Sequence, residues 1–237
     1  MTSSLHAHLL DELVKAGDPE RAQGQQKYMK SQLPFHGVRV PEVRRISRVV
    51  ARAHPIADGG QWEREVLTIW RTATHREQRY GAIELAYAPP YRKLLTPERL
   101  PMLDEMVITG AWWDYVDQLA AKHMGHLLAN YQTEIKPRLL VWSTDPDIWR
   151  RRTAILSQLR FKHDTDLDFL QSMIEPSLAE PEFFLRKAIG WALRAYSKID
   201  PHYVAEYVAT NQDRLSPLSR REALKVIKRK GQTDPNK

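Results

Sequence analysis

The sequence predicts an all-α protein, because apolar residues recur with helical spacing and strict alternation of apolar and polar residues is rare. In the segment 185–198, Leu185, Ile189, Ala192 and Tyr196 lie at positions i, i+4, i+7 and i+11, which places them on one side of a helix. Proline favours the first turn of a helix. Seven prolines stand near expected helix starts, namely Pro19, Pro41, Pro97, Pro146, Pro181, Pro201 and Pro217.

An internal repeat defines the expected arrangement of these helices. Arg152-Thr153-Ala154-Ile155 aligns with Arg186-Lys187-Ala188-Ile189 at an offset of 34 residues. Further apolar anchors follow at 34–36 residues, giving the series Ile83, Leu119, Ile155, Ile189 and Leu224. This period predicts stacked helical hairpins in one domain over residues 1–230, with a disordered tail at 231–237. An irregular helical domain with chance similarity is the alternative.

Composition excludes several classes of protein. The 237 residues include no cysteine, which rules out disulfides, Cys-ligated zinc, iron–sulfur clusters and a thiol nucleophile. No apolar run reaches the roughly 18–20 residues of a membrane span, and the first 15 residues do not resemble a signal peptide. We therefore expect a cytoplasmic protein with no membrane contact.

The net charge of +7 is distributed unevenly. Bases dominate the segments 39–52, 148–163, 183–199 and 219–237, whereas the segment 100–121 carries four acids and no base. Clustered bases suggest a polyanionic partner such as nucleic acid, although a solvated helix face explains them equally well.

Within the segment 185–198, the side opposite the apolar stripe carries Lys187, Trp191, Arg194 and Lys198. A large aromatic residue among cations on such a face is typical of a binding surface, unless a second helix covers it. Tyr28 also lies between bases, and packing of an early helix would explain it as well.

The repeat register places Asp117 at the position of Lys187, so a carboxylate occupies a surface that elsewhere carries bases. Trp113 precedes Asp117 by one helical turn. Two interpretations stay open: chemistry on a developing cation, or a salt bridge to Arg152 or Arg194. His123 and His126 have no third ligand nearby, so we expect no metal site.

Several segments, taken in order, resemble the bacterial AlkD-type DNA alkylation repair glycosylases. The Trp-Trp-Asp and Gly-Trp segments are the most specific, and the likeness covers nearly the whole chain. The matching runs are residues 27–30 (KYMK), 37–41 (GVRVP), 111–117 (AWWDYVD), 148–155 (IWRRRTAI), 187–194 (KAIGWALR) and 217–223 (PLSRREA).

The resemblance implies a right-handed solenoid of HEAT-like repeats whose concave face binds duplex DNA, and excision of N3- and N7-alkylated purines without a deep base pocket. Asp117 matches the catalytic aspartate, and Trp113 and Trp191 match the tryptophans that flank the lesion's deoxyribose. The DNA contacts implied are Tyr28, Arg39, Arg152, Arg160, Lys187 and Arg194. Arg39 stands where the family is expected to have Gln, which puts a base contact there in doubt.

The sequence therefore predicts a monofunctional DNA alkylpurine glycosylase acting in base excision repair, with no cofactor and no obligate protein partner. A DNA-wrapping groove does not require a dimer, so we expect a monomer, associated with the bacterial nucleoid when bound to DNA. The alternative is a non-catalytic HEAT-like nucleic-acid-binding or scaffold protein, which would leave Asp117, Trp113 and Trp191 without a role.

Overall fold

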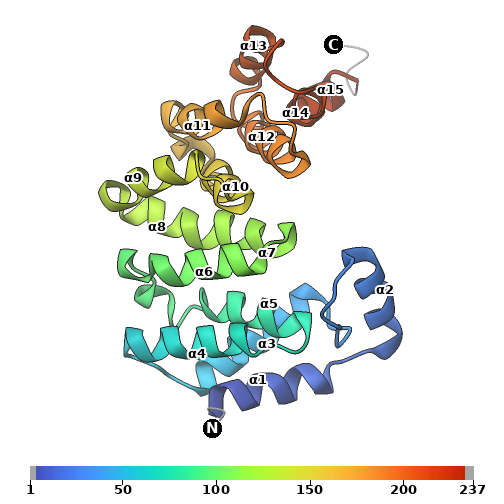
Figure 1. Cartoon of the computed structure of the whole chain (residues 1–237), viewed down its shortest axis with the longest axis vertical. Helices are drawn as coiled ribbons and strands as arrows, with labels where there is room; N and C mark the ends of the chain where they lie inside the picture. Colours follow the sequence, from blue (N-terminus) through green and yellow to red (C-terminus); the bar gives the residue numbers. More distant parts are fainter. Residues whose placement is uncertain (1–3, 233–237) are drawn as a thin grey trace. The chain divides into compact units, whose positions relative to one another are not determined.

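The computed structural model describes residues 4–232, and these residues form helices and connecting turns without a β-strand, so the all-α prediction is confirmed (Figure 1). The chain divides into two compact units, residues 1–102 and 103–237. The boundary falls within helix α6 (Leu100–Gly110). The expectation of one domain over residues 1–230 stays a prediction.

The first unit is built around α5, whose residues are almost entirely buried. Helices α1, α3 and α4 all pack against α5. Asp58 caps α4 through its side chain, so the Asp58-Gly59 dipeptide, a common hairpin sequence, here begins a helix. The elements of this unit are α1 (Ser4–Lys15), α2 (Pro19–Met29), α3 (Val40–Ala53), α4 (Gly59–Arg71), α5 (Arg76–Leu85), η1 (Arg92–Leu94) and η2 (Pro97–Arg99).

The second unit consists of stacked helical hairpins. Helices α7, α10, α12 and α14 pack successively against one another, α9 packs against α10 and α13 against α14, and α11 packs against α9 and α10 (Figure 1). Its elements after α6 are α7 (Trp113–Gln118), η3 (Leu119–Met124), α8 (Gly125–Asn130), α9 (Gln132–Ser143), α10 (Ile148–Leu156), η4 (Lys162–Asp164), α11 (Leu167–Ile174), η5 (Glu175–Ser177), α12 (Phe183–Tyr196), α13 (Pro201–Thr210), α14 (Pro217–Ala223) and α15 (Lys225–Gln232).

The repeat anchors occupy equivalent places in these hairpins. Ile155 and Ile189 are buried in α10 and α12, and Leu119 is buried directly after α7. In the first unit, Ile83 is buried in α5, and Leu224 is half-buried at the end of α14. The predicted repeat of helical hairpins is thus confirmed. The tail prediction stays a prediction: α15 ends at Gln232, and residues 233–237 lie outside the described part.

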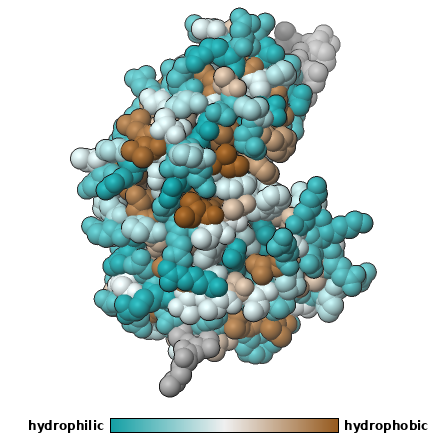
Figure 2. Space-filling model, in the orientation of Figure 1, coloured by the Kyte–Doolittle hydropathy of each residue, from teal (hydrophilic) through white to brown (hydrophobic). Residues whose placement is uncertain are grey.

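The segment η3 is a π-helix that joins α7 to α8 without a break. A π turn bonds residues five apart and so holds one more residue than an α turn. Its side chains are almost all buried, including His123, whose Nδ1 lies 3.3 Å from the carbonyl oxygen of Gln118. On the face shown in Figure 2, hydrophilic residues cover most of the surface and hydrophobic residues form small separate groups.

Candidate nucleic-acid interface and catalytic carboxylate

A strained turn introduces helix α7. Ala111 has a φ of 41°, in the left-handed region that residues other than glycine rarely adopt. Trp112 then returns to extended backbone as the N-cap, and α7 begins at Trp113. Trp113 and Asp117, both partly buried, lie one turn apart on this helix, as the sequence predicts.

The carboxylate of Asp117 forms a two-point ion pair with Arg152 of helix α10. Arg152 Nε donates to Oδ1 at 2.7 Å and Nη2 donates to Oδ2 at 2.9 Å. Of the two salt bridges considered from the sequence, the structure therefore contains the one to Arg152, while Arg194 pairs with a different carboxylate. The side chains are 1% exposed for Arg152 and 18% exposed for Asp117, so water screens the pair weakly.

Burial shifts the ionisation of Asp117. Removal from water raises the pKa of this carboxyl above its ordinary value, and the hydrogen bonds and charge of Arg152 oppose the rise. The nearby charge of Asp114 raises the pKa further. The carboxylate is therefore held by a fixed cation in a largely dehydrated place, where electrostatic interactions are stronger than in water.

Arg152 also contacts helix α12. Its Nη1 donates to the carbonyl oxygen of Phe184, and its guanidinium carbon lies 5.9 Å from the Phe184 ring centroid and 5.3 Å from that of Trp191. With these contacts and the ion pair to Asp117, Arg152 positions the carboxylate and one tryptophan. A phosphate contact by Arg152 stays a prediction. In the structure its side chain is enclosed and bonds to Asp117 and Phe184.

Trp191 is neither fully exposed, as on an open binding surface, nor fully covered by a second helix, the two cases considered from the sequence. Helix α14 packs on α12 and leaves the indole half-buried rather than fully covered. Its Nε1 donates to Oε2 of Glu222 at 3.2 Å. Lys187 and Arg194 flank the ring, with their charged groups 5.1 and 5.8 Å from its centroid, within the range of cation–π attraction.

Arg160, in the turn that follows α10, is exposed. Tyr28 and Arg39 belong to the first unit: Tyr28, in α2, is 76% exposed, and Arg39 is exposed just before α3. The exposure of Tyr28 does not fit the interpretation that it packs an early helix. The structure thus joins Asp117, Arg152 and Trp191 in one contact network and leaves Tyr28, Arg39 and Arg160 free of core packing.

The loop before Arg39 is held by a carboxylate that sequence reasoning missed. Glu77 is fully buried and accepts backbone hydrogen bonds from His36 at 2.9 Å, Gly37 at 2.8 Å and Val38 at 3.0 Å. Gly37 has a φ of 90°, which glycine adopts readily. No local sequence signal connects Glu77 to a loop 40 residues away, but Gly37 marks the turn.

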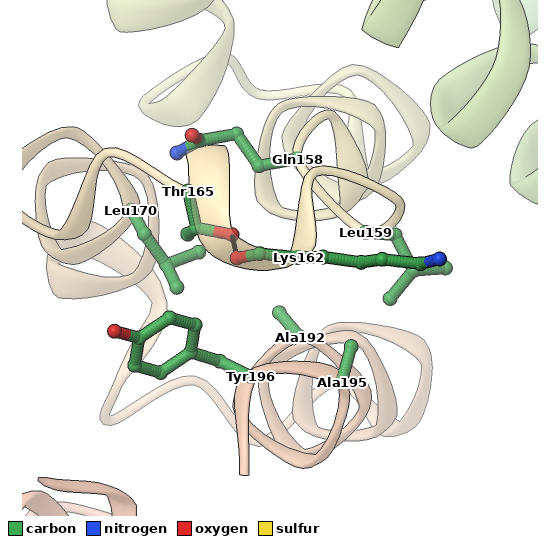
Figure 3. A pocket seen from close by; sticks show the side chains of 8 residues that line it. All are labelled: Gln158, Leu159, Lys162, Thr165, Leu170, Ala192, Ala195 and Tyr196. Atoms are coloured by element: carbon green, nitrogen blue, oxygen red, sulfur yellow. Dashed lines mark hydrogen bonds between the residues drawn. The ribbon is translucent and has the colours of Figure 1, made fainter. Parts of the chain in front are cut away.

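A small cavity lies beside α12 (Figure 3). Ala192, Ala195 and Tyr196 of α12 face Gln158, Leu159 and Lys162 across it. Its volume of about 30 Å³ suits a water molecule and is far below the size of a purine. This cavity does not accommodate a flipped base.

No group of three or more His, Asp or Glu side chains in the described part of the chain is arranged to hold a metal ion. None of the helices within residues 4–232 has the length and apolarity needed to cross a bilayer.

The fold and this network define a helical-repeat protein with a buried, arginine-held carboxylate beside a basic and aromatic surface. The family model of the DNA alkylation repair enzymes matches residues 9–227, so the chain belongs to that family. The similar solved structures include a predicted DNA alkylation repair enzyme from Enterococcus faecalis. It is 33% identical, with a TM-score of 0.79, and the match covers 88% of this chain and 95% of that one. No curated protein matches the chain significantly. The family assigns the protein a role in repairing alkylated DNA, with DNA as its partner.

Proposed function

We propose that the protein is a monofunctional DNA glycosylase that releases cationic N3- and N7-alkylpurines from duplex DNA. The observation that carries this proposal is the Asp117 carboxylate, largely buried, held by Arg152 and joined through it to Trp191. The ion pair with Arg152 explains how a carboxylate is held in this basic face, and the 18% exposure of the Asp117 side chain leaves it open to a positive charge that develops beside it.

The lesion's charge explains why one carboxylate is sufficient. An alkylated purine is already cationic, so the bond from C1′ to the base nitrogen breaks with its electron pair moving to the base, which leaves neutral. Positive charge develops on the deoxyribose as an oxocarbenium-like species, as in glycoside hydrolysis. Asp117 stabilises that charge and orients the water whose oxygen bonds to C1′. The water's proton passes to solvent through the carboxylate, and an abasic site remains.

The tryptophans act on the same charge. In this proposal Trp113 and Trp191 flank the deoxyribose and present aromatic faces, which favour a cation in the transition state. The guanidinium of Arg152, which contacts both Asp117 and Trp191, fixes the carboxylate and the indole relative to each other. The reaction needs no metal or organic cofactor and no partner protein.

The basic residues would hold the DNA backbone. Lys187, Arg194 and Arg160 supply phosphate contacts from the second unit, and Arg39 and Tyr28 supply contacts from the first. Such contacts position the duplex without reading its sequence. We therefore expect affinity for undamaged DNA as well, with a steep dependence on salt.

Asp117→Asn tests the proposal. The variant should lose release of 7-methylguanine from methylated duplex DNA, measured by chromatography of the free base. Its affinity for duplex should stay within about threefold of the wild type, with any change toward tighter binding because one repulsion with phosphate disappears. Unimpaired release would remove Asp117 from the mechanism. If the wild type binds duplex DNA but releases no base, the non-catalytic alternative holds.

A further inference from the structure

Glu222 of helix α14 is the carboxylate around which three residues of α12 gather. Its Oε1 accepts from Lys187 Nζ at 2.8 Å. Its Oε2 accepts from Arg194 Nη1 at 2.8 Å and from Trp191 Nε1 at 3.2 Å. Only 13% of the Glu222 side chain is exposed, so solvent competes weakly for these contacts.

We propose that Glu222 is a positioning residue that fixes the indole of Trp191 and restrains Lys187 and Arg194 beside it. The inference deepens the proposed function, on which its catalytic readout rests. Glu222 occupies the repeat position of Lys187, 35 residues further on, and the same register equates Lys187 with Asp117. The same register thus places one more carboxylate on the basic face.

The hydrogen bond to Trp191 determines how the ring lies. An indole has one donor, Nε1–H, and a half-buried ring without a partner for it can turn about its side-chain bonds. Three cationic groups lie within 6 Å of the ring centroid, those of Arg152 at 5.3 Å, Lys187 at 5.1 Å and Arg194 at 5.8 Å. Their mutual repulsion would drive Lys187 and Arg194 apart if no anion lay between them. Glu222 supplies that anion.

Glu222 stays ionised in this place. Burial alone would oppose ionisation, but the hydrogen bond from Lys187 and the charges of Lys187, Arg194 and Lys225 hold the pKa of Glu222 below its usual value. The carboxylate therefore keeps its charge at neutral pH, and the three contacts persist.

The backbone of α12 is shaped to admit this side chain. A Cβ added at Gly190 would lie 2.5 Å from the Cβ of Glu222 and 2.9 Å from the carbonyl oxygen of Ser219. Only glycine allows α14 to approach α12 this closely. The reach of Glu222 to Trp191 thus depends on the absence of a side chain at the residue before the tryptophan.

The first experiment detects the indole directly, without any activity. The Trp191 indole N–H resonance is assigned in a ¹⁵N-labelled protein by comparison with Trp191→Phe, and then followed in Glu222→Ala and Glu222→Gln. We expect a clear shift in Glu222→Ala and a smaller one in Glu222→Gln, whose amide oxygen still accepts a hydrogen bond. Glu206→Gln, an exposed glutamate of α13, is the matched control and should leave the resonance in place. An unchanged resonance in Glu222→Ala would overturn the inference.

The second experiment separates the ring from the cations. Glu222→Gln frees Lys187 and Arg194. Undamaged duplex should therefore bind to Glu222→Gln about two- to fivefold more tightly than to Glu206→Gln, and the affinity should depend more steeply on salt. Equal affinity and equal salt slope in these two variants would show that Glu222 does not restrain the cations.

Single-turnover release of 7-methylguanine at saturating protein provides the catalytic readout. Glu222→Ala should be slowed about 10- to 100-fold, because a misplaced flanking group disrupts alignment with the reacting atoms, and Glu222→Gln should be slowed far less. Equal loss in both variants would contradict positioning through the indole hydrogen bond. If Glu222→Ala does not fold, the near-isosteric Gln variant still decides the affinity test, in which equal affinity and equal salt slope would overturn the inference. A wild type that releases no base refutes the glycosylase proposal alone, because the other two measurements still decide on Glu222.

Discussion

Replacing Arg152 with glutamine should lower the free energy of unfolding by about 3–5 kcal/mol, because it leaves the largely buried Asp117 carboxylate without its cation. The geometry supports the upper part of this range. Arg152 is 1% exposed and donates to both carboxylate oxygens, at 2.7 and 2.9 Å, and also to the carbonyl oxygen of Phe184. A glutamine amide reaches at most one of these acceptors.

Arg150 on the same helix is a matched control. It forms a similar two-point pair with Asp104, at 2.7 Å for both hydrogen bonds, but both side chains are 27% exposed. Water screens and replaces such a pair more readily, so Arg150→Gln should cost only about 0.2–1 kcal/mol. The two pairs share their chemistry and their helix, while Arg150 has a further contact to Asp145 at 3.3 Å and Arg152 one to Phe184, so the contrast compares a partly exposed arginine cluster with a buried one.

The assay is thermal and urea unfolding of Arg152→Gln, Arg150→Gln, Asp117→Asn and the double variant Arg152→Gln/Asp117→Asn. At roughly 2–4 °C per kcal/mol for a chain of this size, the Arg152 variant should melt about 6–20 °C below the wild type. The double variant should recover part of the loss, since no buried charge is left unpaired. Equal losses for Arg150→Gln and Arg152→Gln, or no recovery in the double variant, would refute the reasoning.

Three further predictions concern backbone, acid stability and pH dependence. Gly37→Ala should lower the free energy of unfolding by about 2–5 kcal/mol, because φ is 90° and the new Cβ would lie 1.9 Å from a backbone oxygen. Gly24→Ala, within α2 and with nothing within 4 Å of the new Cβ, should instead raise it by about 0.5–1 kcal/mol. Burial, aided by the charge of the stacked His75 ring, lowers the pKa of His36 to about 4. The contribution of His36 to the free energy of unfolding is therefore complete above pH 6.5, its pKa in the unfolded chain, and is lost as the pH falls toward 4, by about 1–2 kcal/mol after allowance for partial exposure. His75→Gln should lessen this loss, and an unchanged profile of stability against pH in that variant would contradict the prediction. Burial raises the pKa of Asp117, so single-turnover base release should fall with decreasing pH around a midpoint above the ordinary aspartate value, whereas a midpoint at that value would show that the reacting carboxylate is exposed.

The helices of the second unit could largely be predicted from the sequence, because their signals are local. The apolar stripe of α12 is written in residues four and three apart, and a proline precedes or begins several helices, as at Pro201 and Pro217. The π-helix after α7 could not be predicted, because no local pattern marks its extra residue and its mostly buried side chains face a packing partner, α10, that lies further along the chain.

The sequence predicted which repeat positions form the candidate site, but not which side chains pair with each other. Counting repeats placed Asp117 on the basic face and left two arginines as partners. The choice between them depends on side-chain direction: Arg152 reaches back to α7, whereas Arg194 reaches forward to Glu222 on α14. The same counting, continued 35 residues beyond Lys187, leads to Glu222 and would have found it.

The π-helix between α7 and α8 makes the length of this region as important as its composition. A π turn holds one residue more than an α turn, so deleting one residue from η3 would convert it to regular α winding and leave the helix beyond it in register. Leu127 and Leu128, both buried in α8, would then keep their places in the core, whereas a deletion within α7 would rotate the residues that follow by roughly 100°. Single-residue deletions in residues 119–124 should therefore be better tolerated than deletions in residues 113–118, and a deletion scan would show tolerance beginning two residues after Asp117.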